Sequence, residues 1–357
     1  MHPYSERAPR YFWKRYVPHV PWRDLPLAAH PKFRLARSDK IATAGSCFAQ
    51  HITRYLQGAG CAVYKAEVPH RLVVAHGDEV ASYELFSARY GNIYSARQCM
   101  ELFKQAFGLR PVIEDFAEED GRVYDLLRPN AVPGGFANVE EARADRQFHL
   151  ASVRHMFRTA DVFIFTLGLT ECWYHVERGH TYPMCPGTAR GQYQPQLHRF
   201  HNFSCAEVEA DLQGLVLGLK TVNPGLKIIL TVSPVPLVAT YTDDNVLVAS
   251  SYSKSVLRAA TGAIAAIHEH VAYFPSYEII SHAGSFGQYL ESDLRGVTER
   301  GVAHVMGEFL AAYLAPAPPA AIAPEAEPAP VAAQDNVALM QAMLKAECDE
   351  VFNDIGS

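Results

Sequence analysis

Five short apolar runs recur along this chain, and longer stretches with helical periodicity separate them. They lie at residues 40–43, 62–64, 161–167, 227–232 and 271–274. Short β-branched runs that alternate with helical patterns are typical of a parallel sheet whose crossover helices cover both faces. The chain has 357 residues, 49% apolar and 20% charged, which is enough to bury a large core. The pattern therefore predicts an α/β protein with a mainly parallel central sheet.

The stretches between these runs carry helix start and stop signals. The sequence Ser-Ala-Arg-Gln at 95–98 predicts a capping box that opens a helix ending at Gly108. The sequence Ser-Cys-Ala-Glu at 204–207 predicts a second box, and its helix is expected to end at the Asn-Pro-Gly of 223–225. Both signals support helical crossovers between the strands.

The composition divides the chain into an arm, a domain, a linker and a tail. Residues 1–38, rich in aromatic residues, proline and arginine, predict an irregular arm, and residues 39–314 predict the folded domain. Within the domain, residues 109–158 have mixed charge and a Pro-Gly-Gly turn, which indicates an insertion that caps the active-site edge. Residues 315–334 are nearly all Ala, Pro and Glu and predict an extended linker. Residues 335–357 predict an amphipathic helix that docks on the domain or binds a protein partner.

Charge and cysteine spacing exclude several classes of function. The formal net charge is −6 and the isoelectric point is about 6.2, so no basic surface for nucleic acid is expected. No apolar run approaches a membrane span, and the first residues lack the apolar segment of a signal peptide. The seven cysteines show no C-x-x-C spacing and the sixteen histidines form no H-E-x-x-H motif, so no metal or cofactor is predicted. Unpaired cysteines without an export signal favour the cytoplasm.

A sharp turn at Gly45-Ser46 joins the first apolar run to an amphipathic helix that begins near Phe48. A helix start aims free N–H groups and the positive end of its dipole at such a turn. The hydroxyl of Ser46 could therefore be a nucleophile beside an anion site. Alternatively, Ser46 is a plain N-cap that accepts a hydrogen bond from the first turn of the helix. The adjacent Cys47 is expected to point away into the core.

Several blocks of sequence resemble the GSCFA family of bacterial proteins, which is regarded as a relative of the SGNH (GDSL-like) hydrolases. The blocks are IATAGSCFAQHI at 41–52, SARYGNIY at 87–94, TLGLTE at 166–171, TVSPVP at 231–236 and YFPSYE at 273–278. Together they cover roughly residues 38–312. The resemblance implies a three-layer α/β/α hydrolase fold in which Ser46 is the nucleophile.

The resemblance also implies an oxyanion hole. In SGNH enzymes it is formed by the serine N–H, a glycine N–H of the second block and an asparagine side chain of the third. Here the first two donors would be the N–H groups of Ser46 and Gly91. The third block has Thr170 at the asparagine position, and the side chains of Asn92 and Asn202 are alternative donors. Each donor in such a site contributes about 10²–10³ in rate.

The base of the reaction is the main departure from the SGNH pattern. SGNH enzymes carry Asp-x-x-His before their last helix, but residues 293–296 read Asp-Leu-Arg-Gly, with Gly296 at the histidine position. A serine without a base is a poor nucleophile at neutral pH. His304 or His282 could supply the imidazole, or Asp293 could act directly as a weaker base. Alternatively, the site binds a ligand without hydrolysing it.

We therefore expect a cytoplasmic serine esterase or acyl-transfer enzyme acting on a small-molecule or carbohydrate ester, without nucleic-acid or membrane partners. The expected substrate contacts are Tyr90, Trp173 and Glu171. Alternatively, the two aromatic rings are ordinary packing residues, and Glu171 forms a helix cap or an ion pair. Lys254 and Arg258 are expected to line the cleft or to form a solvated face. Two other functions stay open: an inactive protein that binds glycans or acyl ligands, and a polysaccharide O-acyltransferase.

Overall fold

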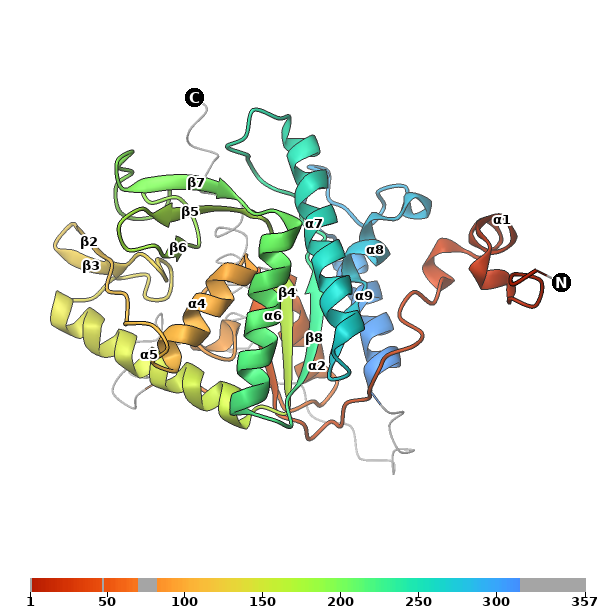
Figure 1. Cartoon of the computed structure of the whole chain (residues 1–357), viewed down its shortest axis with the longest axis horizontal. Helices are drawn as coiled ribbons and strands as arrows, with labels where there is room; N and C mark the ends of the chain where they lie inside the picture. Colours follow the sequence, from red (N-terminus) through yellow and green to blue (C-terminus); the bar gives the residue numbers. More distant parts are fainter. Residues whose placement is uncertain (1, 47, 70–81, 315–357) are drawn as a thin grey trace, which may run out of the picture.

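A computed structural model of the chain describes residues 2–46, 48–69 and 82–314. The predicted linker, the predicted C-terminal helix and the orientation predicted for Cys47 lie outside these residues. Strands β1, β4, β8 and β9 form a parallel sheet in that order (Figure 1). Their bounds are Ile41–Gly45, Val162–Leu167, Lys227–Val232 and Val271–Phe274. The predicted run at 62–64 contributes a parallel bridge between Val63 and Ile41.

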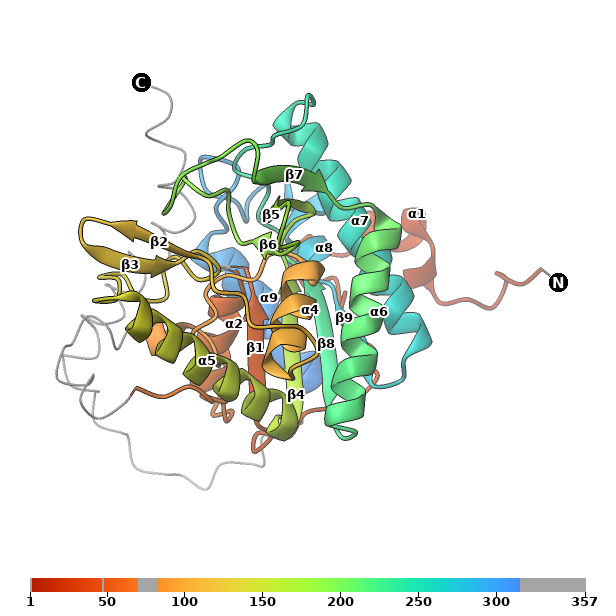
Figure 2. The ribbon, with the colours of Figure 1, turned by 60° about the vertical axis from the view of Figure 1, so that its left-hand side comes forward.

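Helices cover both faces of this sheet. Helices α4, α5, α6 and α7 pack on one face, and α2, α8 and α9 pack on the other (Figures 1 and 2). The first group spans Ala96–Ala106, Val139–Thr159, Cys205–Val222 and Val246–Ile267, and the second spans Phe48–Gly58, Ser276–Ser281 and Glu299–Tyr313. The predicted three-layer α/β/α architecture is confirmed.

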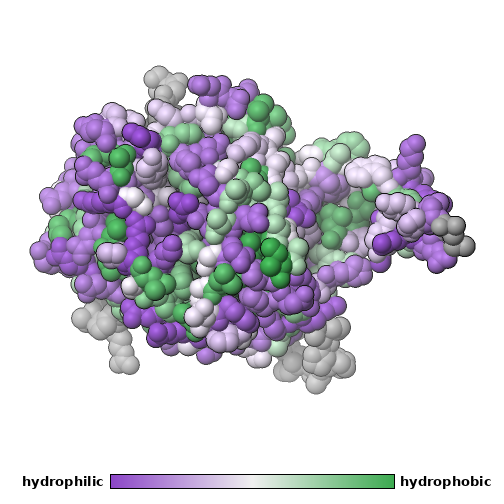
Figure 3. Space-filling model, in the orientation of Figure 1, coloured by the Kyte–Doolittle hydropathy of each residue, from purple (hydrophilic) through white to green (hydrophobic). Residues whose placement is uncertain are grey.

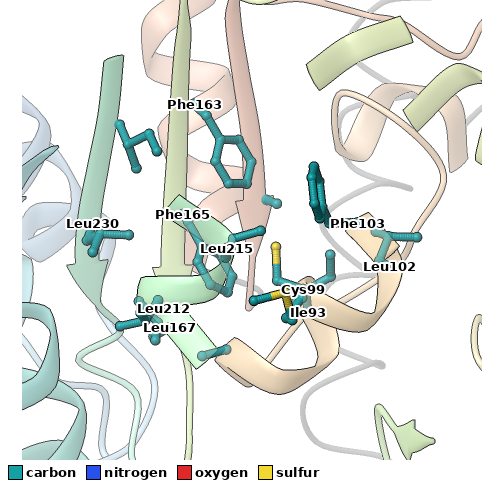
Figure 4. Packing of buried hydrophobic residues seen from close by; sticks show 14 of the residues in the cluster. Ile93, Cys99, Leu102, Phe103, Phe163, Phe165, Leu167, Leu212, Leu215 and Leu230 are labelled. Atoms are coloured by element: carbon teal, nitrogen blue, oxygen red, sulfur yellow. The ribbon is translucent and has the colours of Figure 1, made fainter. Parts of the chain in front are cut away.

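The sheet separates two hydrophobic cores, because neighbouring residues of a strand point to opposite faces. In β4, Phe163 and Phe165 belong to the core beneath α4 and α6, whereas Val162 and Ile164 belong to the core beneath α2 and α9. Figure 4 shows the first of these cores. There the two phenylalanine rings meet side chains from both helices, namely Cys99, Leu102, Phe103, Leu212 and Leu215.

Side chains at the helix starts satisfy the free N–H groups of the first turn. Ser204 accepts from the N–H of Glu207, and the carboxylate of Glu207 accepts from the N–H of Ser204, which confirms the predicted capping box. Ser95 likewise caps α4 by accepting from the N–H of Gln98. The side chain of Gln98, however, accepts from the N–H of Tyr94, so that predicted box is only half formed.

A small antiparallel sheet lies over the carboxyl edge of the central sheet, at the top of Figure 1. It consists of β6, β5 and β7, with bounds Thr181–Tyr182, Glu171–His175 and His198–Asn202. This sheet covers the edge at which β1, β4 and β8 end.

The segment predicted as an insertion, residues 109–158, forms a hairpin and most of α5. The hairpin strands β2 and β3 span Phe116–Glu119 and Arg122–Asp125. On α5, Leu150, Val153 and Met156 are buried in the main core. The later part of this segment is therefore an integral layer of the domain.

The N-terminal arm projects from the domain and packs against it from Trp22 onward (Figure 1). Its short helical turns are Pro9–Tyr11, Trp13–Tyr16 (labelled α1), Val17–His19 and Trp22–Asp24. Leu25, Ala28 and Leu35 are buried against the domain, whereas Trp13 is 73% exposed.

The face of the molecule that carries α6 and α7 has hydrophobic surface gathered over these two helices (Figure 3). Exposed apolar side chains there include Leu217 on α6 and Leu247 and Val248 on α7. Among the residues that the structure describes, no helix has the length and hydrophobicity needed to cross a membrane.

Candidate active site

A pocket of about 340 Å³ opens at the carboxyl edge of the central sheet. Its floor consists of Ser46, Gly168 and Ser233, which directly follow β1, β4 and β8. The walls come from the small antiparallel sheet, from residues 182–185 and from the loop at 233–241. Open α/β sheets bind ligands beyond the carboxyl ends of their strands. This pocket is therefore the candidate active site.

Ser46 reaches the pocket because Gly45 lets β1 pass very close to β4. Gly45 has a φ of +143°, and a Cβ atom on it would lie 2.4 Å from the carbonyl oxygen of Thr166. Glycine, which lacks Cβ, fits this position. The N–H of Ser46 donates to the same oxygen of Thr166 at 3.2 Å. The Ser46 N–H, a predicted oxyanion donor, is thus already bonded to β4.

The Ser46 hydroxyl distinguishes between the two roles predicted for this residue. An N-cap hydroxyl would accept a hydrogen bond from the first turn of α2. Instead, the N–H of Ala49 donates to the main-chain oxygen of Ser46 at 2.8 Å. The hydroxyl itself has no hydrogen-bond partner among the described residues, although Ser46 is only 3% exposed. The absence of a capping bond leaves this hydroxyl available to a ligand in the pocket.

Two buried side chains of α7 hold the loop after β4 next to Ser46. Nζ of Lys254 donates to the carbonyl oxygen of Gly168 at 2.6 Å, and Oγ of Ser253 accepts from the N–H of Thr170 at 3.0 Å. A Cβ atom on Gly168 would lie 3.3 Å from Cβ of Ser46. The residue that Lys254 contacts is therefore the one that packs against Ser46.

Thr170 and Asn202, two of the predicted oxyanion donors, contact each other. The Thr170 hydroxyl donates to Oδ1 of Asn202 at 2.6 Å. This bond ties the start of β5 to the end of β7, where Glu171 pairs with Asn202. Neither Thr170 nor Asn202 is among the described residues that line the pocket.

Gly91 and Asn92 of the second sequence block lie beside a small cavity next to the main pocket and do not line the main pocket. Residues 183 and 184 line both the main pocket and a small cavity beside Gly91 and Asn92. Tyr90 is buried, and its hydroxyl donates to the main chain of β1. Burial also raises the pKa of Tyr90. From this block, Tyr94 is the residue that lines the main pocket.

Buried ion pairs hold the second block in place. Arg89 pairs with Glu67 at 3.0 Å and also with Asp145, which accepts from Arg128 at 2.8 Å. Nδ1 of His149 lies 2.7 Å from Glu67, and burial, together with the charge of Arg128, lowers the pKa of His149 to about 4. Removing one partner of such a network leaves an uncompensated buried charge, which costs about 3–5 kcal/mol.

The turn that contains Asp293 places its carboxylate outside the pocket lining and Arg295 inside it. Oδ1 of Asp293 accepts from the N–H groups of Arg295 and Gly296, each at 2.9 Å, and these bonds lower the pKa of Asp293. A Cβ atom on Gly296 would lie 3.0 Å from Cγ of Glu291. A side chain at the position expected to hold the catalytic histidine would therefore meet the exposed side chain of Glu291.

His304 and His282 lie beside the N-terminal arm. The His304 ring stacks on Tyr289 with centroids 5.3 Å apart, and Trp22 of the arm lies 4.8 Å from Tyr289 and 6.4 Å from His282. Burial lowers the pKa of both histidines. Neither is among the described residues that line the pocket. The structure thus groups these two histidines with the arm, and not with Ser46.

Glu171 and Trp173, two expected substrate contacts, both line the pocket. The carboxylate of Glu171 accepts from the hydroxyl of Thr240 at 2.6 Å and from the N–H of Tyr241 at 3.2 Å. The ring of Trp173 packs against that of Tyr241, with centroids 4.7 Å apart. Glu171 therefore anchors the loop at 233–241, and Trp173 contributes to the wall that this loop completes.

Sequence reasoning missed most of the pocket walls. The missed residues include Tyr182, Met184, Tyr193, Phe200, Leu237, Val238, Tyr241 and Arg295. One signal was present, because the apolar loop at 235–239 follows a central parallel strand at the edge where ligands bind. The other wall residues are far apart in the sequence and meet only through the pairing of β5 with β6 and β7.

In the part of the chain that the structure describes, no group of three or more His, Cys, Asp or Glu side chains is placed to bind a metal ion. The polar side chains that line the pocket include the serines Ser46 and Ser233 of its floor, Glu171 and Arg295.

Comparison with known proteins places most of this chain in one family. The model of the GSCFA family matches residues 40–309, which is more than half of the chain and includes every pocket residue named above. No curated protein matches the chain.

Proposed function

This chain belongs to the GSCFA family, and we propose that it is an SGNH-like serine esterase or acyl-transfer enzyme that acts on a small-molecule or carbohydrate ester through Ser46. The observation that carries the proposal is the Ser46 hydroxyl. It stands at the end of β1 in the floor of a pocket, and it makes no capping bond to α2. A serine at the carboxyl edge of a parallel sheet, beside a helix start, is well placed for nucleophilic attack.

In this proposal Oγ of Ser46 attacks the acyl carbon, and its proton must pass to a nearby base. We assign that role to Lys254 rather than to His304 or His282. Lys254 is buried and bonds to Gly168, which packs against Ser46. A lysine acts as a base in its neutral form. The protonated amine then returns the proton to the departing alkoxide.

The oxyanion of the intermediate needs donors that face the pocket. The N–H of Ser46 is bonded to Thr166, so we propose that Arg295, which lines the pocket, stabilises the developing negative charge. The Gly91 N–H and the Asn92 side chain would contribute if the segment at 183–184 moves on substrate binding. Thr170 and Asn202 are proposed to position the start of β5.

A labelling experiment tests the role of Ser46. The purified chain is incubated with a serine-reactive fluorophosphonate and with an activated ester, beside Ser46→Ala and Ser251→Ala. Ser251 is exposed on α7 and bonds its own helix, so it serves as the matched control. We expect labelling and turnover in the parent and in Ser251→Ala, and neither in Ser46→Ala. Equal labelling of all three proteins would rule out Ser46 as the nucleophile.

A protein that binds ester ligands without turnover is the second candidate. The observation that favours it is Gly296 at the expected histidine position, together with the placement of His304 and His282 beside the arm. Ligand binding without fluorophosphonate labelling would identify this function. An O-acyltransferase, the third candidate, would instead transfer the acyl group to an added alcohol faster than to water.

A further inference from the structure

The pocket beside Ser46 is walled by aromatic and aliphatic side chains. Trp173, Phe200 and Tyr241 form one wall, with ring centroids 4.7–5.7 Å apart. Met184 and Leu237 add aliphatic surface. The volume of about 340 Å³ lies within the usual range of small-molecule pockets, roughly 300–1,000 Å³. An acetyl group at Ser46 would leave most of this volume unfilled.

Three hydroxyl groups of the lining already donate hydrogen bonds within the protein. The Tyr182 hydroxyl donates to the carboxylate of Asp115 at 2.5 Å, and the Thr240 hydroxyl donates to the carboxylate of Glu171 at 2.6 Å. The Thr188 hydroxyl donates to the main-chain oxygen of Cys185 at 2.6 Å. A sugar ring would bring several further hydroxyl groups into this pocket, and each unpaired one would cost free energy. The walls therefore favour an apolar group over a sugar.

The pocket leads from a buried end at Ser46 to the protein surface. Ser46 and Tyr182 are 3% and 2% exposed, whereas Val238 and Tyr241 are 41% and 64% exposed. An acyl chain whose carbonyl carbon lies at Ser46 would therefore run along the aromatic wall and emerge near Val238.

We infer that the substrate is an ester of an apolar acid, whose medium-length acyl chain, on the order of eight carbons, or aromatic acyl group fills this pocket. The inference rests on the proposed function and adds the acyl class. Oγ of Ser46 forms the bond to the carbonyl carbon and its proton moves to Lys254. The bond from that carbon to the alcohol oxygen then breaks, and the alkoxide takes the proton. Water or an acceptor hydroxyl finally releases the acyl group from Ser46.

Acyl-chain selectivity tests this inference. Turnover is measured with p-nitrophenyl esters from acetyl to decanoyl, and in parallel with acetate esters of alcohols of growing length. We expect kcat/KM to rise about fourfold per methylene in the acyl series, which corresponds to about 0.8 kcal/mol per buried CH₂, and to stay flat in the alcohol series. A preference for acetyl esters, for a sugar acetate, or for longer alcohols alone would overturn the acyl assignment.

A matched pair of variants locates the chain. Val238 and Val246 are 41% and 39% exposed, and only Val238 is among the described residues that line the pocket. We expect Val238→Trp to lower kcat/KM for the decanoyl ester about tenfold while sparing the acetyl ester. Val246→Trp is expected to change neither. Equal effects of the two substitutions would place the chain elsewhere.

Ligand binding separates this inference from the proposed catalysis. Decanoate is titrated calorimetrically into Ser46→Ala, where we expect binding with a negative heat-capacity change and weaker binding when Val238→Trp is added. Decanoate binding without ester turnover by the parent would keep the pocket assignment and remove the enzymatic proposal. Turnover through Ser46 without decanoate binding or chain-length preference would keep the enzymatic proposal and remove the pocket assignment.

Discussion

The close approach of β1 to β4 at Gly45 can be tested by one added methyl group. In Gly45→Ala the new Cβ atom would lie 2.4 Å from the carbonyl oxygen, 2.7 Å from Cβ and 2.9 Å from the nitrogen of Thr166. Two of these atoms belong to the backbone of β4 and cannot rotate away. The strands must therefore separate at the residue that precedes Ser46, or the turn must change its conformation.

Two costs add up in this variant. A φ of +143° is unfavourable for a residue with Cβ and costs about 1–3 kcal/mol. Overpacking against a rigid neighbour costs about 1–3 kcal/mol more. The expected loss is about 4 kcal/mol, which lowers Tm by about 10 °C in a domain of this size.

Gly60→Ala is the matched control, because Gly60 also has a positive φ, +74°, but a Cβ atom there would meet nothing within 4 Å. Its expected cost is the backbone term alone, about 1–2 kcal/mol. Thermal unfolding followed by circular dichroism gives both values, and fluorophosphonate labelling reports on the geometry of Ser46. If both variants lower Tm equally and label equally, the contact between β1 and β4 is not what requires glycine at position 45.

Three further predictions concern the site and its support. Lys254→Met should lower kcat/KM about 10²–10⁴-fold, whereas Lys104→Met, at an exposed position of α4, should leave kcat/KM unchanged. Glu171→Gln removes one of the two acceptor oxygens that anchor the loop after β8. We therefore expect a higher KM and faster hydrogen exchange in that loop. Glu177→Gln, at an exposed position, should change neither quantity. Burial holds the pKa of His149 at about 4, below its unfolded value of 6.5. Between these two pH values the folded state therefore binds fewer protons than the unfolded state. The free energy of unfolding should fall by up to about 3 kcal/mol as the pH drops from 6.5 to 4. In urea unfolding experiments, His149→Gln should not show this fall.

The central sheet could be predicted because its strands carry their signal locally. The predicted runs at 227–232 and 271–274 coincide with β8 and β9, and those at 40–43 and 161–167 overlap β1 and β4. These strands are buried on both faces and therefore read as continuous apolar runs. The run at 62–64 pairs at a single position beside the sheet, where few contacts reinforce its propensity.

The pocket walls could not be predicted, because their strands lack such a signal. β5 and β7 read Glu-Cys-Trp-Tyr-His and His-Arg-Phe-His-Asn, in which apolar and polar residues do not alternate in a way that marks one buried face. Their register, which pairs Trp173 with Phe200, is set by long-range pairing. The placement of His304 and His282 beside the arm likewise depends on Trp22 and Tyr289, which are distant in the sequence.

The departure at Gly296 concerns more than one missing side chain. Cγ of Glu291 would lie 3.0 Å from a Cβ atom at this position, and both backbone N–H groups of the turn bind Asp293. A histidine placed at 296 would require the exposed Glu291 side chain to shift, and Oδ1 of Asp293 already accepts two hydrogen bonds from its own turn. With glycine at position 296, the base that we propose for Ser46 comes from another element. Lys254, which reaches the Ser46–Gly168 contact from α7, supplies that base with a buried, basic side chain.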